Sequence, residues 1–171
     1  MGLLDRIFRR DAAPSPHALY AAIVGVARDP DWYRAGAAPD TLDGRFDMLA
    51  AVLAAVLLRL DAEGAAGRMA AVRLTELFVT DMDAQLREAG IGDIVVGKHI
   101  GRMMGALGGR LGAYRSGLGA GGDLADALRR NLYRGNTPDA AAVAHNAARL
   151  QALGQRLRAR TIAALLAGEI G

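Results

Sequence analysis

The chain has 171 residues, with 21 basic and 18 acidic side chains, three histidines and no cysteine. This length is typical of one compact domain with its own core, and the lack of cysteine excludes disulfides and thiolate-based metal or catalytic sites. Because the histidines are far apart and the arginines are spread over the whole chain, we expect no metal site, no cofactor and no nucleic-acid partner.

Residues 1–14 form a basic amphipathic segment, which we separate from a helical domain over residues 15–171. The sequence MGLLDRIFRR sets apolar side chains against arginines, and it lacks the hydrophobic region and the cleavage site of a signal peptide. This pattern favours a short helix on an anionic membrane surface, with a disordered basic tail as the alternative. The side chains expected to touch the membrane are Leu3, Leu4, Ile7 and Phe8.

Helices are predicted for the rest of the chain. All five prolines lie near its two edges, and none falls between Asp40 and Thr137. Proline breaks helix interiors, so this distribution permits long helices in the middle, and the β-branched residues that favour strands are few. The predicted fold is therefore all-α, a single compact bundle of six to seven helices.

The first part of the chain is expected to form two helices joined by a short turn. Ser15 and Pro16 are typical of an N-cap followed by the first helical residue, and this helix ends before the next proline. Residues 31–33 form a turn or a short helix. Asp40 or Thr41 then caps a second, longer helix.

Residues 48–58 are an unbroken run of apolar side chains in this longer helix, which is expected to end near residue 62. A run of this length extends about 16 Å as a helix, whereas a bilayer core needs about 20 apolar residues. The run therefore predicts a helix at the centre of the bundle rather than a membrane span.

Four further helices are predicted towards the C-terminus. Gly90 is expected as the C′ residue of the first, Asp93 as the N-cap of the second, and Thr137 as the N-cap of the last, which continues unbroken. The predicted ranges are 67–89, 93–117, 123–133 and 137–167.

Glycines recur every four residues along the helix predicted for residues 93–117. Each one costs about 1 kcal/mol relative to alanine in a helix interior, so the stripe predicts a close helix crossing inside the bundle. The alternative is a flat apolar groove for a partner helix or a lipid tail, helped by two adaptable methionines. The stripe consists of Gly97, Gly101, Gly105 and Gly109. The groove would be lined by Gly97, Gly101, Met103, Met104 and Gly105.

A group of charged residues lies within residues 78–98. Asp81 and Glu88 lie two turns apart on one helix face, and Asp83 and Arg87 are an i,i+4 pair. Paired carboxylates can serve acid–base catalysis or bind a hard cation, and DMD is similar to the aspartate-rich motif of helical prenyl-transfer enzymes, although a second copy is missing. The alternative is a solvated charged face.

Taken together, these segments resemble the ubiquinol–cytochrome c chaperone family, over roughly residues 18 to 134. The most specific part is the order DT-x-x-GRF followed by DMD-x-x-LRE-x-G-x-GD. The matching residues are Tyr33, PDTLDGRF at 39–46, Arg59-Leu60, Phe78, TDMD at 80–83, LRE at 86–88, GIGD at 90–93, Lys98, Gly109-Arg110, Tyr114 and RNLY at 130–133.

The resemblance implies a non-enzymatic assembly chaperone of respiratory complex III, in a compact bacterial form. Its client would be the membrane protein cytochrome b, with a small helper protein as a further partner, and it would sit in the cytoplasm against the inner membrane. The glycine-rich helix departs from what the family leads us to expect. The signature residues are Tyr33, Asp40, Thr41, Gly44, Arg45, Phe46, Asp81, Asp83, Arg87, Glu88, Asp93, Lys98, Arg110 and Tyr114.

Two questions stay open at this stage. The charged signature residues either form the rim of a binding groove or a buried network that fixes the helices. The chain is either a chaperone or a helical protein that binds or converts a lipid, quinone or isoprenoid, with Asp81, Asp83 and Glu88 around a divalent cation. The second function predicts a deep pocket lined by these carboxylates.

Overall fold

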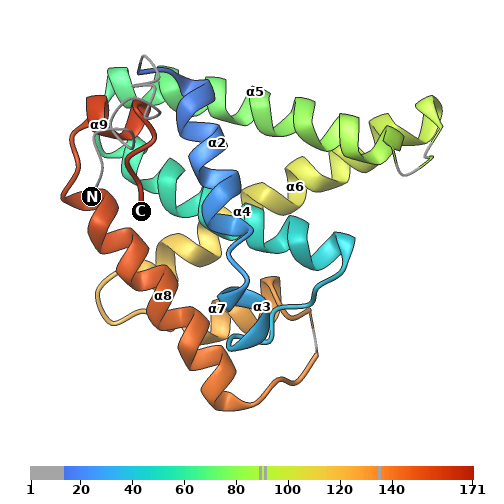
Figure 1. Ribbon diagram of the computed structural model, residues 1–171, viewed down its shortest axis with the longest axis vertical. Helices are drawn as coiled ribbons and strands as arrows, with labels where there is room; N and C mark the ends of the chain where they lie inside the picture. The colour runs from blue at the N-terminus through green and yellow to red at the C-terminus, as the bar shows by residue number, and fades with distance from the viewer. Residues whose placement is uncertain (1–13, 89, 91, 135) are drawn as a thin grey trace, which may run out of the picture.

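The computed structural model describes residues 14–88, 90, 92–134 and 136–171, and only the backbone at positions 93 and 94. The predicted membrane contacts Leu3, Leu4, Ile7 and Phe8 lie outside these residues. The described residues contain helices and no strand, which confirms the all-α prediction (Figure 1). The helices are α2 (Pro16–Ala27), α3 (Asp31–Arg34), α4 (Leu42–Asp61), α5 (Ala65–Glu88), α6 (Asp93–Leu118), α7 (Leu124–Asn131), α8 (Ala140–Arg158) and α9 (Ile162–Leu166).

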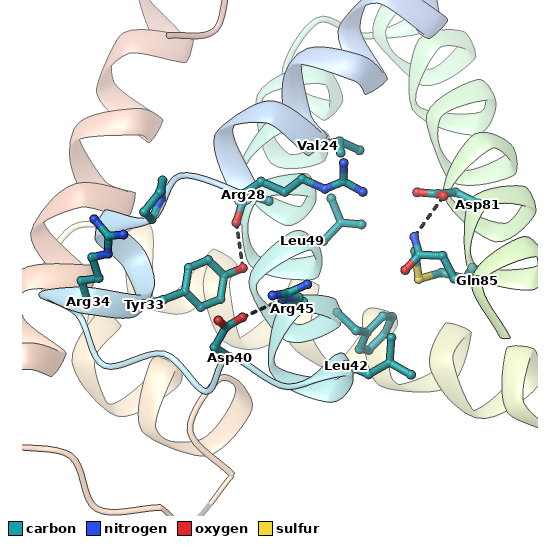
Figure 2. A pocket seen from close by; sticks show the side chains of 14 residues that line it. Val24, Arg28, Tyr33, Arg34, Asp40, Leu42, Arg45, Leu49, Asp81 and Gln85 are labelled. Carbon is teal, nitrogen blue, oxygen red and sulfur yellow. Dashed lines mark hydrogen bonds and ion pairs between the residues drawn. The ribbon is translucent and has the colours of Figure 1, made fainter. Parts of the chain in front are cut away.

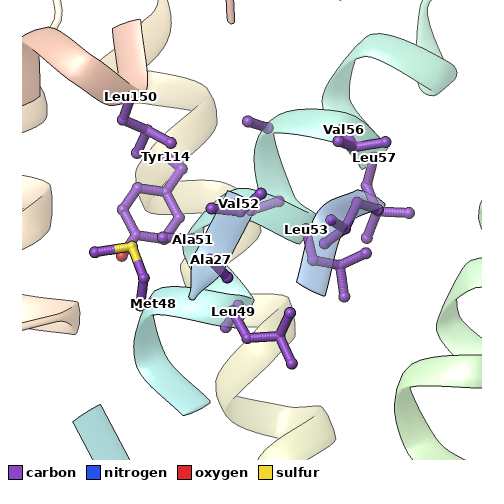
Figure 3. Close-up of a cluster of buried hydrophobic side chains, with 14 of the residues drawn as sticks. Ala27, Met48, Leu49, Ala51, Val52, Leu53, Val56, Leu57, Tyr114 and Leu150 are labelled. Carbon is purple, nitrogen blue, oxygen red and sulfur yellow. The ribbon is translucent and has the colours of Figure 1, made fainter. Parts of the chain in front are cut away.

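Helix α4 lies at the centre and packs against α2, α5, α6 and α8. Every residue over 46–57 is buried, and all but Asp47 are apolar, so this part of the helix is buried all round rather than on one stripe. Figure 3 shows Met48 and Val52 of α4 packed near Tyr114 of α6 and Leu150 of α8. The predicted central helix is confirmed, and within the described residues no helix has the length and apolar character needed to cross a bilayer.

Side-chain caps fix the starts of several helices where the sequence predicts them. The hydroxyl of Ser15 accepts from Ala18 N at 3.1 Å, and that of Thr41 accepts from Gly44 N at 3.1 Å. Gly90 has a φ of +81°, as its predicted place after α5 requires. The predicted cap at Asp93 is wrong, because the N-cap of α6 is the preceding glycine, which offers no side chain.

The C-terminal part differs from the single long helix predicted from position 137 to 167. Asp139, and not Thr137, is the N-cap of α8, and α8 ends at Arg158. The chain then turns, and the hydroxyl of Thr161 accepts from Ala164 N at 3.2 Å to start α9. This turn buries Leu165, and it brings α9 against α2. Burial against another helix therefore decides where the last helix breaks.

The predicted close crossing at the glycine stripe is wrong. A Cβ added to Gly97, Gly101, Gly105 or Gly109 would meet no atom of the described residues within 4 Å, so no described helix packs closely on this face of α6. Helices α5 and α6 extend together to one side, away from the other helices that the structure describes (Figure 1).

A polar network ties α8 to the turn between α2 and α4. Arg149 donates to Asp29 at 2.7 Å and to Asp31 at 2.8 Å, and its guanidinium lies 4.2 Å from the ring centroid of Trp32. Asn146, which is fully buried, donates to the carbonyls of Trp32 at 3.2 Å and Gly36 at 3.0 Å. These bonds hold the segment that leads into α4 in one position.

The carboxyl of Asp29 is expected to report on this network. The N–H of Asp31 and the guanidinium of Arg149 hold the pKa of Asp29 below its ordinary value of 3.8. Because the folded-state pKa is lowered, the pairing contributes stability above the ordinary value and loses it as pH falls through the folded pKa. In Arg149→Gln, a carboxyl titration followed by NMR should show the pKa of Asp29 rise towards its ordinary value, but only in part, because the hydrogen bond from the Asp31 N–H remains. An unchanged pKa would contradict this role, and Arg156→Gln, on the exposed side of α8, is the control.

Candidate functional site

A groove runs across the start of α4, between the segment around α3 on one side and helices α5 and α6 on the other. It consists of two adjoining cavities of about 490 and 460 Å³. Both are lined by Leu42, Phe46, Met82 and Gln85, which we call the saddle of the groove. The first half also contains Val24, Arg28, Tyr33, Arg34, Asp40, Arg45, Leu49 and Asp81, and the second half Asp43, Leu86, His99, Arg102, Met103, Arg110 and Arg134.

The apolar part of the groove comes from one face of the first turns of α4. Leu42 and Phe46 are four residues apart and therefore lie on the same side of the helix. Leu42 is 53% exposed, whereas Phe46 is 7% exposed and packs against Phe78, with ring centroids 5.7 Å apart. The exposed leucine over a buried aromatic floor makes the saddle accessible to an apolar group.

Gly44 sets the path of the chain at the entrance of α4. A Cβ at this position would lie 1.9 Å from the carbonyl oxygen of Pro39. The backbone can turn this tightly only at a residue without a side chain. The glycine of the GRF motif therefore brings residues 39–41 against the first turn of α4, beside the groove.

On the first half of the groove, Tyr33 and the pair Asp40–Arg45 form the outer edge. The Tyr33 hydroxyl donates to the carbonyl of Ala27 at 2.9 Å, and burial raises the pKa of this phenol (Figure 2). Arg45 donates to Asp40 at 2.7 Å, and the same contact holds the pKa of the Asp40 carboxyl below its ordinary value. Both members of the pair are exposed, so they belong to the rim.

Asp81 connects α2 to α5 at the opposite wall. The Tyr20 hydroxyl donates to one carboxylate oxygen at 2.7 Å, and the amide of Gln85 donates to the other at 3.0 Å. Burial, together with this hydrogen bond and the charge of Asp81, raises the pKa of Tyr20 above its ordinary value. Both oxygens of Asp81 are therefore engaged: the bond from Tyr20 holds α2 to α5, and the bond from Gln85 lies within α5.

The carboxylates Asp81, Asp83 and Glu88 do not form the cation site that the alternative function requires. Asp83 lies 2.6 Å from Arg87 in an exposed i,i+4 pair, and Glu88 is exposed. Of the three, only Asp81 lines the groove. Over the residues that the structure describes, no group of three or more histidines and carboxylates is placed to hold a metal ion. The predicted deep pocket lined by these three carboxylates is absent from the same residues.

A buried ion cluster lies beneath the second half of the groove. Asp47 is 1% exposed and pairs with Arg110, whose guanidinium also lies 5.1 Å from the ring centroid of Phe46. Arg134 adds a second guanidinium, with Nε at 2.5 Å and Nη2 at 2.7 Å from the two carboxylate oxygens. Burial raises the pKa of Asp47, whereas the contact with Arg134 and the charges of both arginines lower it.

Sequence reasoning missed Asp47 and Arg134 as functional candidates. Asp47 was visible only as the boundary of the apolar run, yet it falls three residues after the buried Gly44 and four before the buried Ala51. That spacing places it on an inward face of α4, which was the available signal. Arg134 carries no such signal, because it lies in the turn after α7 with an unusual φ of +47°.

The remaining predicted residues are distributed over several places. Met103 lines the groove, while Met104 packs against the core without lining it. Tyr114 is fully buried near Arg110, and burial raises the pKa of its phenol. Lys98 is exposed on α6 and does not line the groove, nor do Gly97, Gly101 and Gly105. The charged signature residues therefore divide into two groups. Asp40 and Arg45 lie on the rim of the groove, whereas Asp81 and Arg110 belong to the bonds that fix the helices.

The comparisons with known proteins show the family and the fold of the chain. The family model described as ubiquinol-cytochrome C chaperone matches residues 34–170. The crystal structure of the Cbp3 homolog from Brucella abortus has a TM-score of 0.79 and 32% sequence identity, covering 98% of this chain and 94% of that one. No curated protein matches the chain. With a family match over most of its length and a solved relative of the same fold, the chain belongs to the ubiquinol–cytochrome c chaperone family.

Proposed function

We propose that this protein is an assembly chaperone that binds cytochrome b of the ubiquinol–cytochrome c reductase complex through the groove at the start of α4. One observation carries the proposal. The two most specific family segments, 39–46 and 80–88, are far apart in sequence, yet residues of both line this groove. A surface built from the family's own signature is the best candidate for the family's common task.

The chemistry of the groove suits an apolar client. Exposed Leu42 and the half-buried, flexible side chain of Met103 can adapt to different apolar side chains, and a polar rim surrounds them. The carboxylates beside it are engaged in structural bonds, as described for Asp47 and Asp81. We therefore infer a function in binding, without turnover of a substrate.

Two further parts of the proposal rest on the family and on the N-terminal sequence. A small helper protein joins the complex, and the protein works in the cytoplasm beside the inner membrane. The N-terminal residues Leu3, Leu4, Ile7 and Phe8 would supply a weak contact with the membrane surface, since a short amphipathic segment binds reversibly.

Replacing Leu42 by asparagine is expected to remove most of the client binding. Full burial of an exposed leucine contributes about 1.5–3 kcal/mol, and Leu42 is 53% exposed before binding, so about half of this is at stake and recovery of cytochrome b should fall by about fivefold to tenfold. The measurement is co-purification of cytochrome b with the tagged protein from detergent-solubilised native membranes. The matched control is Val72→Asn on α5, because Val72 is 54% exposed and does not line the groove.

Recovery by wild-type protein and by Val72→Asn, with loss in Leu42→Asn, would support the proposal. Failure of the wild-type protein to recover cytochrome b would contradict the choice of client. Equal recovery by all three would contradict the choice of surface.

A further inference from the structure

We propose that the groove selects a client segment with an apolar middle and acidic residues on both sides of it. This inference rests on the proposed function, because it names the chemistry of the segment that the groove accepts. It is carried by the distribution of charge along the groove, which is positive at both ends and neutral at the saddle.

The first half of the groove has three arginines and two aspartates. The aspartates are both occupied, since Asp40 pairs with Arg45 and Asp81 accepts from two hydrogen-bond donors. Arg28 and Arg34 are exposed, and within the described residues neither one has a carboxylate partner. Figure 2 shows Arg34 on the outer side of Tyr33 and the Arg28 guanidinium farther in, near Val24 and Leu49. Both line the first half of the groove and not the second, so this half can accept a carboxylate from another molecule.

The second half of the groove also has more arginines than aspartates. Arg110 and Arg134 share the single buried carboxylate of Asp47, and Asp43 lies 3.8 Å from Arg134. Arg102 is exposed, and its bond in the described part of the chain is to the ring nitrogen Nδ1 of His99 at 3.3 Å. Three guanidiniums thus face two carboxylates here as well.

Between the two ends the saddle carries no charge. Leu42, Phe46 and Met82 are apolar, and Gln85 is neutral. Charge complementarity then requires carboxylates near the ends of the bound segment and apolar side chains in its middle. A continuous anionic surface, such as a lipid bilayer, fits less well, because Asp40 and Asp43 on the rim would face it.

The test uses three fluorescein-labelled peptides that share one leucine–alanine middle and carry glutamates, glutamines or lysines at both ends. Their binding to the full chain is measured by anisotropy at low and at high salt. Exposed ion pairs are individually weak, so several of them together should make the glutamate peptide bind about tenfold tighter than the glutamine peptide at low salt. The lysine peptide should bind weakest, and salt should reduce the differences.

Variants connect this preference to the groove. The double variant Arg28→Gln with Arg102→Gln should lose most of the preference for glutamate while still binding the glutamine peptide. Arg156→Gln, an exposed substitution on α8, should keep the preference. Leu42→Asn should weaken all three peptides, because it alters the saddle they share.

Several results would overturn the inference: no binding of any peptide, equal affinities for the three, or a preference that survives the double variant. Competitive displacement of the glutamate peptide by phosphatidylglycerol vesicles would assign the arginines to lipid headgroups instead. If the preference is absent while Leu42→Asn still loses cytochrome b, the charge inference fails and the proposed function stands. If the peptides behave as expected but cytochrome b is not recovered, the proposed client is wrong.

Discussion

Replacing Asp47 by alanine is expected to lower the free energy of unfolding by about 3–5 kcal/mol. The carboxylate is 1% exposed, and it is the counter-ion of Arg110, whose side chain is 6% exposed. Without it, Arg110 would remain buried as an unpaired charge, because Nη2 makes its bond to Asp47 while Nε and Nη1 have no hydrogen-bond partner among the described residues. Arg134 is 45% exposed and can turn towards water, so the main cost falls on Arg110.

Urea unfolding followed by circular dichroism measures this loss. The matched control is Asp83→Ala, which removes an exposed i,i+4 pair with Arg87 and should cost at most about 1 kcal/mol. Substituting both members of the buried pair, Asp47→Leu with Arg110→Met, should recover most of the stability, since no charge is then left buried alone. A similar small loss in Asp47→Ala and Asp83→Ala would show that the buried cluster does not hold the helices together.

Replacing Gly44 by alanine is expected to cost about 2–4 kcal/mol. The added Cβ would overlap the carbonyl oxygen of Pro39, and backbone must move to make room. This movement also pulls on the cap formed by the Thr41 hydroxyl, which is worth about 1 kcal/mol. Because the same residues border the groove, peptide binding should weaken together with stability.

The opposite result is expected for Gly101→Ala in the interior of α6. An added methyl group there meets no atom within 4 Å, and alanine favours a helix over glycine by about 1 kcal/mol. Urea unfolding of the two variants therefore compares one glycine required by a close contact with one that is not. A lower free energy of unfolding in Gly101→Ala would show that this face of α6 is packed. An unchanged free energy of unfolding in Gly44→Ala would show that the backbone at Pro39 can move at little cost.

The starts and ends of helices were predictable wherever they depend on nearby residues. Ser15 and Thr41 cap their helices through hydrogen bonds to backbone three residues away, and Gly90 takes the positive φ that ends α5. The buried run of α4 was predictable for the same reason, since eleven consecutive apolar residues have no other stable place in a protein in water. Such features depend only on a few residues that are adjacent in sequence.

The break between α8 and α9 and the open glycine face of α6 were not predictable in this way. The break at Arg158 depends on how well Leu165 fits against the rest of the bundle, and that fit involves residues distant in sequence. The glycine stripe has the pattern of a close crossing, but whether a neighbouring helix reaches it depends on the directions of α5 and α6.

The sequence by itself determined the all-α class, the central helix, the caps at Ser15 and Thr41, and the family. Tertiary structure alone decided that the two signature segments meet in one groove, that Asp81 holds α2 to α5, and that Asp47 is shared by Arg110 and Arg134. The physical reason is the difference in sequence distance over which these interactions act. Helix propensity and capping act over three or four residues, whereas the partner of a buried charge is chosen by the packing of whole helices.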